Sequence, residues 1–464
     1  MRNVINLSFE ITVSRREYWI IDSNVVAVHT IPGNLMGSSI ITDIVARPIF
    51  DGGARLSLEV VVTTESTTVR AAPSFSDPRS SGKYEINHFP EDGVKGCIKL
   101  INSVIRERLI GMNAADQELI DDVFLDIDGT DTFDNIGGNT AEAVSLTIAK
   151  AAAASHGVPL YKEARINSTV GVPHIMPNII GGGATMGNEG WKGRTPDIQD
   201  HIILPVGCKS FYEEMEAVCA VYHRVGILLQ DADLHYTGGR DEEYCWLPGI
   251  DDINCLAILE QASREVAGRR GISFRLGLDV GAADLWDEIE GVYHYTREGV
   301  KRTPAEHARH LAELVEQFNL FYMEDSFYED HVDLYIEQMQ QFGDRVLIAG
   351  DDLLAGNSRR LEQMAERGAV NCAVIKLNMA GTVSRARQFV EICKSNGITT
   401  IGSCRTYDSP DDTLSDLIVA WGCQAYKCGS PAGGEHAAKQ NRFLRIDEEL
   451  GNNSSFNEFC KVMP

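Results

Sequence analysis

The chain has 464 residues, of which 44% are hydrophobic, a length and composition that suggest two or three domains with a large core. Its formal net charge of −25 and pI of about 4.9 argue against nonspecific binding to nucleic acid or anionic membranes, because the long-range field repels phosphates. No stretch is apolar over enough length to span a bilayer, the start lacks a signal-peptide pattern, and the 11 cysteines lack paired CxxC spacing, so we expect reduced thiols and a cytoplasmic protein.

The first third of the chain predicts an α+β domain behind an extra segment. Residues 1–37 are interpreted as an appended segment, and residues 38–170 as the α+β domain. Within it, IITDIVARPIF and ARLSLEVVVTT predict a β-hairpin joined by the Gly-rich turn DGGA. The polar loop PSFSDPRSSG follows. Helices are then expected around residues 93–110, 115–126 and 139–155.

A second domain is expected over residues 171–464, after the Pro- and Gly-rich segment VGVPHIMPNIIGGG. Apolar runs alternate there with amphipathic helical stretches, which predicts a parallel sheet. The number of units favours a closed βα-barrel over an open sheet. The expected strands are HIILPVG, ISFRLGLDV, FYMED, VLIAGDD, AVIKLN, TTIGSC and AYKCGS. Helices are expected at residues 211–232, 251–269, 303–318, 357–368, 382–396 and 410–422.

Charged residues end four successive apolar runs of this second domain. The first three end in Asp279, Glu324 and Asp351, and the fourth ends in Lys376. A single acidic residue after a strand would be read as a turn or helix cap, but four in register favour a shared site at the carboxyl ends of the barrel strands. Three carboxylates suit a hard divalent cation such as Mg²⁺, and a neighbouring lysine suits a base.

Four segments of the chain resemble the enolase family. NCAVIKLNMAGTVSRARQFVEICKSNG is similar to the segment around the enolase catalytic lysine, and AYKCGSP with GEHAAKQNRFLRIDEELG to the enolase C-terminal segment. LDIDGTDTFDNIGGNTAEAVSLTIAKAAAASHGVPLY resembles the enolase N-terminal domain, and VPHIMPNIIGGG the start of its barrel. The resemblance spans about residues 39–451. It implies an N-terminal α+β capping domain, a modified (βα)₈ barrel of TIM type, and a homodimer or larger homo-oligomer.

The resemblance also implies roles for the residues at the strand ends. Asp279, Glu324 and Asp351 would hold the tighter of two Mg²⁺ ions. Lys376 would remove the proton α to the substrate carboxylate, and Lys427 would contact that carboxylate. The substrate would therefore be a small anion bound with two magnesium ions.

At the other end of the substrate, the family pattern is partly kept. Arg405 corresponds to the arginine that grips phosphate, with Thr406 at a neighbouring phosphate-contacting position. Two family histidines are replaced, one by Thr185 in GGGATMG and the other by Cys404 in SCRTYD. The insertion NEGWKGRTP, which contains Trp191, adds to the expectation that the substrate-covering loops are remodelled.

Three further positions have a less direct counterpart in the family. Aligned on Gly82, Ser80 would back the second Mg²⁺, although the loop is about three residues longer than in the family. Asp200 stands where the family has a glutamate that helps hydroxide leave. The second acid of that pair falls in GGRDEEYCWLP, where registering on Trp246 and Pro248 selects Glu243 and registering on the Asp-Glu pair selects Glu242.

These residues lead to one main hypothesis for function and two alternatives. The main one is a Mg²⁺-dependent enolase-type lyase that acts on 2-phosphoglycerate or a close analogue. Because two histidines are lost, we expect an altered substrate in phosphonate natural-product biosynthesis, for example in a carboxyphosphonoenolpyruvate-forming pathway. The first alternative is an ordinary glycolytic enolase. The second is a catalytically silent homologue that acts as a binding protein.

Overall fold

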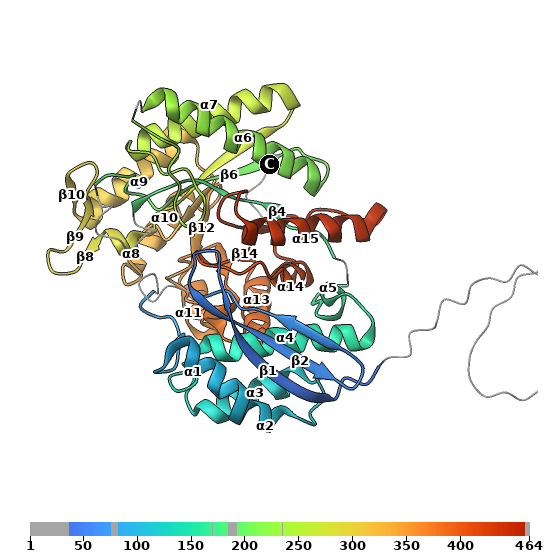
Figure 1. Ribbon diagram of the computed structural model, residues 1–464. Coiled ribbons are helices and arrows are strands. Elements are labelled where there is room, and N and C mark those ends of the chain that lie inside the picture. The colour runs from blue at the N-terminus through green and yellow to red at the C-terminus, as the bar shows by residue number, and fades with distance from the viewer. Residues whose placement is uncertain (1–36, 76–81, 169, 184–192, 234, 460–464) are drawn as a thin grey trace, which may run out of the picture.

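A computed structural model describes residues 37–75, 82–168, 170–183, 193–233 and 235–459. Most of the expected appended segment, residues 1–36, lies outside these ranges, as do Ser80 and Thr185. The described chain forms an N-terminal α+β domain and a barrel ringed by helices (Figure 1). The α+β domain, coloured blue to teal, lies against one end of the barrel. The predicted fold class is therefore confirmed.

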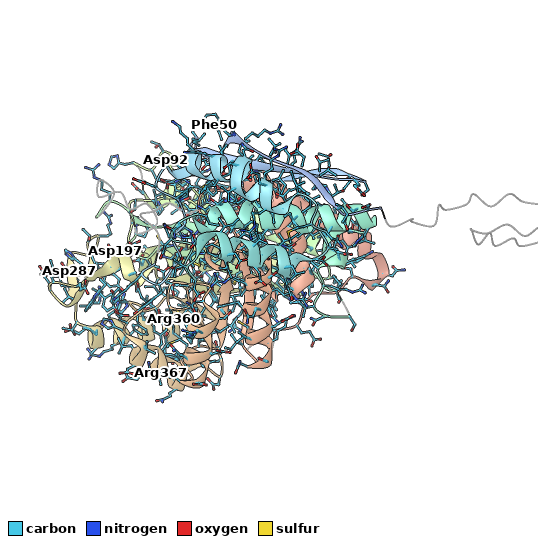
Figure 2. The ribbon with its side chains drawn as sticks, turned by 90° about the horizontal axis from the view of Figure 1, so that it is seen from below. Phe50, Asp92, Asp197, Asp287, Arg360 and Arg367 are labelled. Atoms are coloured by element: carbon cyan, nitrogen blue, oxygen red, sulfur yellow. The ribbon has the colours of Figure 1, made fainter. Side chains whose placement is uncertain are left out.

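The N-terminal sheet has three antiparallel strands, β1 (Ile41–Phe50), β2 (Leu56–Thr64) and β3 (Thr68–Ala71). The predicted hairpin is confirmed, whereas β3 was not predicted. Asp51 closes the hairpin turn, because its Oδ1 accepts the backbone N–H groups of Gly53 and Arg55, both at 2.9 Å. Phe50 lies at the outer edge of the molecule with 72% of its surface exposed (Figure 2).

The helices of this domain pack on its sheet or on one another. They are α1 (Gly93–Leu100), a π-helical turn (Ile101–Ile105), α2 (Arg106–Leu109), α3 (Gln117–Asp128), α4 (Gly138–His156) and α5 (Leu160–Glu163). All three helices predicted for the domain are thus confirmed. Helices α3, α4 and α5 also contact helices of the barrel. Helix α4 is almost completely buried, and its alanines allow β2, β3 and the barrel helices to approach closely. It ends at Gly157, whose φ of +66° suits a residue without a side chain.

The barrel sheet contains nine strand segments in the order β4-β15-β14-β13-β12-β11-β7-β6-β5. They are β4 (His174–Ile175), β5 (Asn178–Gly181), β6 (Asp200–Val206), β7 (Ser273–Asp279), β11 (Tyr322–Glu324), β12 (Leu347–Gly350), β13 (Cys372–Ile375), β14 (Thr399–Ser403) and β15 (Ala425–Lys427). All seven predicted strands are confirmed. Only Met176 and Pro177 separate β4 from β5, and β4 pairs with β15 while β5 pairs with β6. This short segment therefore joins the two edges of the sheet and closes the barrel.

One strand of the barrel runs against the predicted direction. β6 pairs antiparallel with both β5 and β7, whereas the strands from β7 through β15 to β4 pair parallel. The expectation of a uniformly parallel sheet was therefore wrong at β6. The reason is connectivity. The described residues between β5 and β6 contain no α-helix, whereas two helices, α6 (Phe211–Ala232) and α7 (Asp252–Arg270), separate β6 from β7.

The outer helices follow the sequence pattern closely, with some omissions. Besides α6 and α7, the predicted helices appear as α9 (Pro304–Phe318), α11 (Ser358–Glu366), α13 (Val383–Ser395) and α14 (Thr413–Trp421). Helices α10 (Val332–Phe342) and α15 (Gly434–Leu450) were not predicted. Nor was the three-stranded sheet of β8 (Trp286–Asp287), β9 (Val292–Tyr295) and β10 (Val300–Arg302). In the described ranges, no helix combines the length and the apolar character needed to cross a membrane.

The loop after the first hairpin docks the N-terminal domain on the barrel. Arg360 of α11, labelled in Figure 2, stacks on the ring of Tyr84, and its guanidinium carbon lies 3.6 Å from the ring centroid. The same guanidinium donates to the backbone oxygen of Glu329 at 2.9 Å. Lys83 pairs with Asp330 at 2.7 Å. These contacts hold residues 82–85 at the mouth of the barrel.

Candidate active site

The candidate site follows from the two-residue period of the barrel strands. One hydrophobic cluster consists of strand residues such as Ile202, Tyr322, Ala349, Val374 and Ala425, all buried. Because side chains alternate along a strand, residues two positions apart lie on the same face of the sheet. On each of these strands, the residue two positions closer to the candidate site therefore shares the face of the buried residue. These residues are Asp200, Glu324, Asp351, Lys376 and Lys427. The period thus brings the predicted residues together above the packed interior.

The charged side chains surround one cavity of about 120 Å³. Of the predicted residues, it is lined by Asp200, Glu243, Asp279, Asp351, Lys376, Cys404, Arg405, Thr406 and Lys427. Glu324 is fully buried beside it. Every predicted site residue that the structure describes therefore belongs to this single location, while Ser80 and Thr185 lie outside the described residues.

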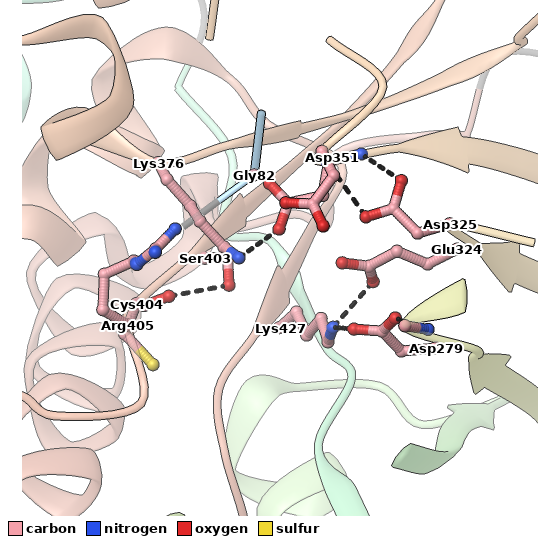
Figure 3. A network of polar contacts seen from close by, with 12 residues as sticks. Gly82, Asp279, Glu324, Asp325, Asp351, Lys376, Ser403, Cys404, Arg405 and Lys427 are labelled. Atoms are coloured by element: carbon pink, nitrogen blue, oxygen red, sulfur yellow. Dashed lines mark hydrogen bonds and ion pairs between the residues drawn. The ribbon is translucent and has the colours of Figure 1, made fainter. Parts of the chain in front are cut away.

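Lys427 is one of two lysines that form ion pairs with carboxylates of the site. Its Nζ donates to Asp279 Oδ2 at 2.5 Å and to Glu324 Oε2 at 2.7 Å (Figure 3). Burial disfavours the charged amine, but Asp279 and Glu324 outweigh burial and raise the pKa of Lys427 well above its ordinary value. Burial and the charge of Asp279 likewise raise the pKa of Glu324.

Lys376 is the second of these lysines and pairs with Asp351 (Figure 3). Burial lowers the pKa of this amine, but the carboxylate of Asp351 outweighs burial and raises it, so Lys376 is a cation in this arrangement. The positive charges of Arg405 and Lys427 lower the pKa of Lys376, because like charges disfavour the protonated amine. Lys376 can therefore become a neutral base only when the charge of Asp351 is engaged elsewhere.

The sequence reasoning missed two carboxylates of the site, Asp325 and Asp352. Asp325 accepts the backbone N–H groups of Asp351 at 3.1 Å and of Asp352 at 2.9 Å. Burial, followed by the charge of Asp351, raises the pKa of Asp325 well above its ordinary value. Asp325 directly follows the predicted ligand Glu324, and Asp352 directly follows the predicted ligand Asp351. These paired acidic residues were the signal by which the sequence could have identified both carboxylates.

The carboxylates are suited to a hard cation. Oxygen atoms of Asp279, Glu324 and Asp325 lie within 4.8 Å of one another, and so do those of Asp325, Asp351 and Asp352. Asp351 thus belongs to the second group and not to the first. Lys376 pairs with Asp351, and Lys427 pairs with Asp279 and Glu324. Buried Glu324 Oε1 and Asp351 Oδ1 have no hydrogen-bond partner among the described residues. Buried carboxylate oxygen atoms without a hydrogen-bond partner fit the all-oxygen coordination of Mg²⁺.

Arg405 forms the cationic wall at the other end of the cavity. It is only 5% exposed, and its Nη2 lies 3.6 Å from Glu85 Oε1. The same oxygen accepts the backbone N–H of Gly82 at 2.9 Å, while Glu85 Oε2 lies 2.5 Å from His88 Nε2. Burial alone would raise the pKa of Glu85, but Arg405 and His88 lower it to about 2. The sequence reasoning missed Glu85 and His88, because they belong to the other domain.

A pair of acids lies on the third side of the cavity. Glu243 lines the cavity and accepts a hydrogen bond from Asn178 Nδ2 at 3.0 Å. Glu242 is not among the lining residues and instead accepts from the Tyr407 hydroxyl at 3.1 Å. Burial, followed by the charge of Glu243, raises the pKa of Asp200 well above its ordinary value. The geometry thus favours Glu243 as the partner of Asp200.

The position directly before Arg405 carries a thiol where an imidazole was expected from the family pattern. Cys404 is 5% exposed, and burial raises its pKa to about 12, so the thiol is neutral. No histidine is among the described residues that line the cavity. The described lining therefore offers carboxyl and amine groups, and no imidazole, for proton transfer.

Comparison with known proteins assigns both parts of the chain to one family. The family model described as the enolase C-terminal TIM barrel domain matches residues 168–462, and the enolase N-terminal domain matches residues 41–163. A protein named enolase from Methanothermobacter thermautotrophicus is 36% identical over 413 residues, which cover 89% of this chain and 97% of that protein. The enolase of Methanosphaera stadtmanae is 36% identical over 417 residues, 90% of this chain and 99% of that protein. The enolase of Pyrobaculum aerophilum is 34% identical over 418 residues, 89% and 97% of the two chains.

Proposed function

The chain belongs to the enolase family of carbon–oxygen lyases, and we propose that it dehydrates 2-phosphoglycerate to phosphoenolpyruvate with Mg²⁺. The relatives named enolase cover about nine-tenths of the chain, which favours the ordinary-enolase alternative over an altered substrate. None of the comparisons supports a phosphonate pathway. The observation that carries the proposal is the convergence of Lys376, Lys427 and Arg405 with the carboxylates around one cavity.

We assign proton abstraction to Lys376. Its amine lies on the wall of the cavity between Asp351 and Arg405, where it can reach the carbon next to a bound carboxylate. When bound, Mg²⁺ supplies positive charge to the substrate carboxylate and so makes the neighbouring proton more acidic. Asp279, Glu324 and Asp351 would hold this ion, with Asp325 as a supporting carboxylate. Lys427 would bind the substrate carboxylate from the opposite side.

Asp200 and Glu243 would complete the reaction by protonating the leaving hydroxyl. Burial raises the pKa of Asp200 and so favours its protonated form, and a protonated carboxyl group can donate its proton to a leaving group. The proton taken by Lys376 and the proton given by the acid pair then balance the loss of one water molecule. Arg405 would hold the phosphate, since a guanidinium in a buried pocket pairs well with a dianion.

The direct test of this proposal is turnover of 2-phosphoglycerate. We expect Mg²⁺-dependent formation of phosphoenolpyruvate with kcat in the ordinary range of about 1–10³ s⁻¹. The measurement is a steady-state assay on the full chain with and without a chelator. If the protein binds Mg²⁺ but leaves 2-phosphoglycerate unchanged, the ordinary-enolase proposal is wrong. Proton exchange on an analogue would then indicate the altered substrate, and no exchange on any carboxylate would indicate a silent homologue.

A substitution of Glu243 separates the two halves of the reaction. In Glu243→Gln we expect overall dehydration to fall by about 10²–10⁴-fold, the usual contribution of a general acid. Exchange of the α-proton should continue, because Lys376 is untouched. The measurement compares phosphoenolpyruvate formation with deuterium incorporation into 2-phosphoglycerate.

Its neighbour provides the matched control. Glu242→Gln removes the same charge one residue away but on a side chain that faces Tyr407. We expect this variant to keep most of its dehydration activity. Equal losses in the two variants, or a loss in Glu242→Gln alone, would contradict the assignment of Glu243.

The remaining expectations from the sequence stay predictions. A homodimer or larger homo-oligomer and a cytoplasmic location are proposed from family membership. Ser80 and Thr185 are proposed as magnesium- and substrate-facing residues on the same ground. The oligomer can be checked by light scattering on the purified full chain.

A further inference from the structure

A second cluster of ligating side chains lies next to the catalytic cavity. It consists of Asp200 on β6 together with Asp241 and Cys245 on the loop between α6 and α7. One ligand atom from each residue lies within 4.8 Å of the others. All three side chains are more than nine-tenths buried, and only Asp200 also lines the catalytic cavity. None of the three belongs to the magnesium carboxylates described above.

The carboxylate of Asp241 is held in one orientation. Its Oδ1 accepts the backbone N–H groups of Glu243 at 2.9 Å and of Cys245 at 2.8 Å. Its Oδ2 is buried and has no hydrogen-bond partner among the described residues. Gly181 makes this position possible, because a Cβ there would lie 1.9 Å from Asp241 Oδ2. This oxygen of Asp241 thus packs against Gly181, where any larger residue would collide with it.

Asp200 contributes a second oxygen of the same kind. Its Oδ1 is also buried without a hydrogen-bond partner in the described chain. Two ionised carboxylates buried within 4.8 Å of each other carry a large desolvation cost and repel each other unless a proton or a cation neutralises them. The nearby amine of Lys427 is already engaged by Asp279 and Glu324. A proton on one of the two carboxyl groups or a bound cation would therefore have to neutralise the pair.

The thiol of Cys245 indicates which cation would suit the cluster. Mg²⁺ prefers oxygen ligands only, whereas Zn²⁺ and Co²⁺ accept thiolate and carboxylate together. Three protein ligands and an open fourth position are typical of zinc sites that are reached by solvent. We propose that Asp200, Asp241 and Cys245 form a separate binding site for a thiophilic divalent cation such as Zn²⁺. Binding would release the thiol proton of Cys245 to solvent as the metal–sulfur bond forms.

Occupancy of this site would act on the catalytic reaction through Asp200. A carboxylate that coordinates Zn²⁺ cannot keep the proton that the leaving hydroxyl requires. We therefore expect Zn²⁺ to inhibit dehydration at saturating Mg²⁺, and to leave the exchange reaction of Lys376 less affected. Inhibition of this kind would indicate that Zn²⁺ regulates the enzyme by binding to this cluster.

The experiment uses Co²⁺ as a spectroscopic probe on the full chain in saturating Mg²⁺. We expect a thiolate-to-cobalt charge-transfer band with a stoichiometry of one ion per chain, and Zn²⁺ should displace it. Cys245→Ser should lose the band, whereas Cys97→Ser, which changes a buried thiol of α1, should keep it. Absence of the band in the unsubstituted protein, or its survival in Cys245→Ser, would overturn the proposal and show that protons alone neutralise the two carboxyl groups.

Two further variants test the site independently of any folding defect in Cys245→Ser. Asp241→Asn keeps the shape of the side chain and removes its charge, and Gly181→Ala fills the space beside it. Partners of metal ligands contribute about 10–100-fold to affinity, so loss of the Asp241 ligand should weaken Co²⁺ binding at least that much. Circular dichroism establishes that each variant is folded, and unchanged Co²⁺ affinity in folded Asp241→Asn would refute the site. The spectra are recorded without substrate, so failure of this site is separable from failure of the proposed dehydration.

Discussion

Lys376→Ala is expected to stop exchange of the substrate α-proton with deuterated solvent, with a loss of at least about 10²–10⁴-fold. The amine lines the cavity and pairs with Asp351 alone, whereas the amine of Lys427 is held by two carboxylates and Lys83 pairs with Asp330. Without it, no neutral base adjoins the bound carboxylate. Magnesium affinity should stay within a few-fold, because the carboxylates remain. The measurements are deuterium incorporation by NMR and Mg²⁺ titration of the same sample.

Two further variants separate a base from a simple positive charge. Lys376→Arg keeps the charge, but a guanidinium does not lose its proton at accessible pH, so it should be inactive as well. Lys209→Ala removes an exposed lysine at the start of α6 and should exchange normally. Substantial exchange in Lys376→Arg would mean that the residue acts through its charge, and exchange in Lys376→Ala at the unsubstituted rate would refute its role altogether.

Removal of magnesium should produce the largest effect on stability. A ligand that binds only the folded state adds about 2.7 kcal/mol at a concentration of 100 times its Kd. We therefore expect Mg²⁺ to raise the Tm and a chelator to reverse the rise. In Glu324→Gln the rise should disappear along with turnover, because this variant lacks a buried ligand at the centre of the carboxylate group. Thermal melts over a series of Mg²⁺ concentrations measure the effect.

A surface glutamate serves as the comparison for this variant. Glu337→Gln removes an exposed carboxylate of α10 and should keep the full magnesium-dependent rise in Tm. An equal rise in Glu324→Gln would place the ion elsewhere. A rise that is lost in both variants would indicate a general charge effect on a chain with a net charge of −25.

Local patterns in the chain were sufficient for most of the fold. Each strand of the barrel is a short apolar run, and most predicted helices have the period of an amphipathic surface helix, while the buried α4 is marked by its run of alanines. These features are visible without any contact between distant residues. The antiparallel β6 was predicted in the wrong direction, because strand direction depends on which elements connect neighbours and not on the strand itself. The small sheet of β8, β9 and β10 was missed, since strands of two to four residues have too few positions to show a period.

The candidate site likewise contains residues that the sequence determines and residues that only the structure identifies. The strand-end residues Asp279, Glu324, Asp351 and Lys376 are determined by the sequence alone, because a two-residue period and a parallel arrangement carry them to one face. The choice of Glu243 over Glu242 needed the structure, since adjacent residues on a loop have no fixed direction until the loop is packed.

Contacts across long stretches of chain were decided only by the tertiary structure. Glu85 and Arg405 are 320 positions apart, and only the docking of the N-terminal domain places them 3.6 Å from each other. The cluster of Asp200, Asp241 and Cys245 likewise depends on a loop that folds back beside β6 against Gly181. The sequence by itself determined the family, the barrel and the strand-end charges, because these are local or periodic features. Pairings between separate elements depend on the packing of the whole chain, and no local pattern encodes them.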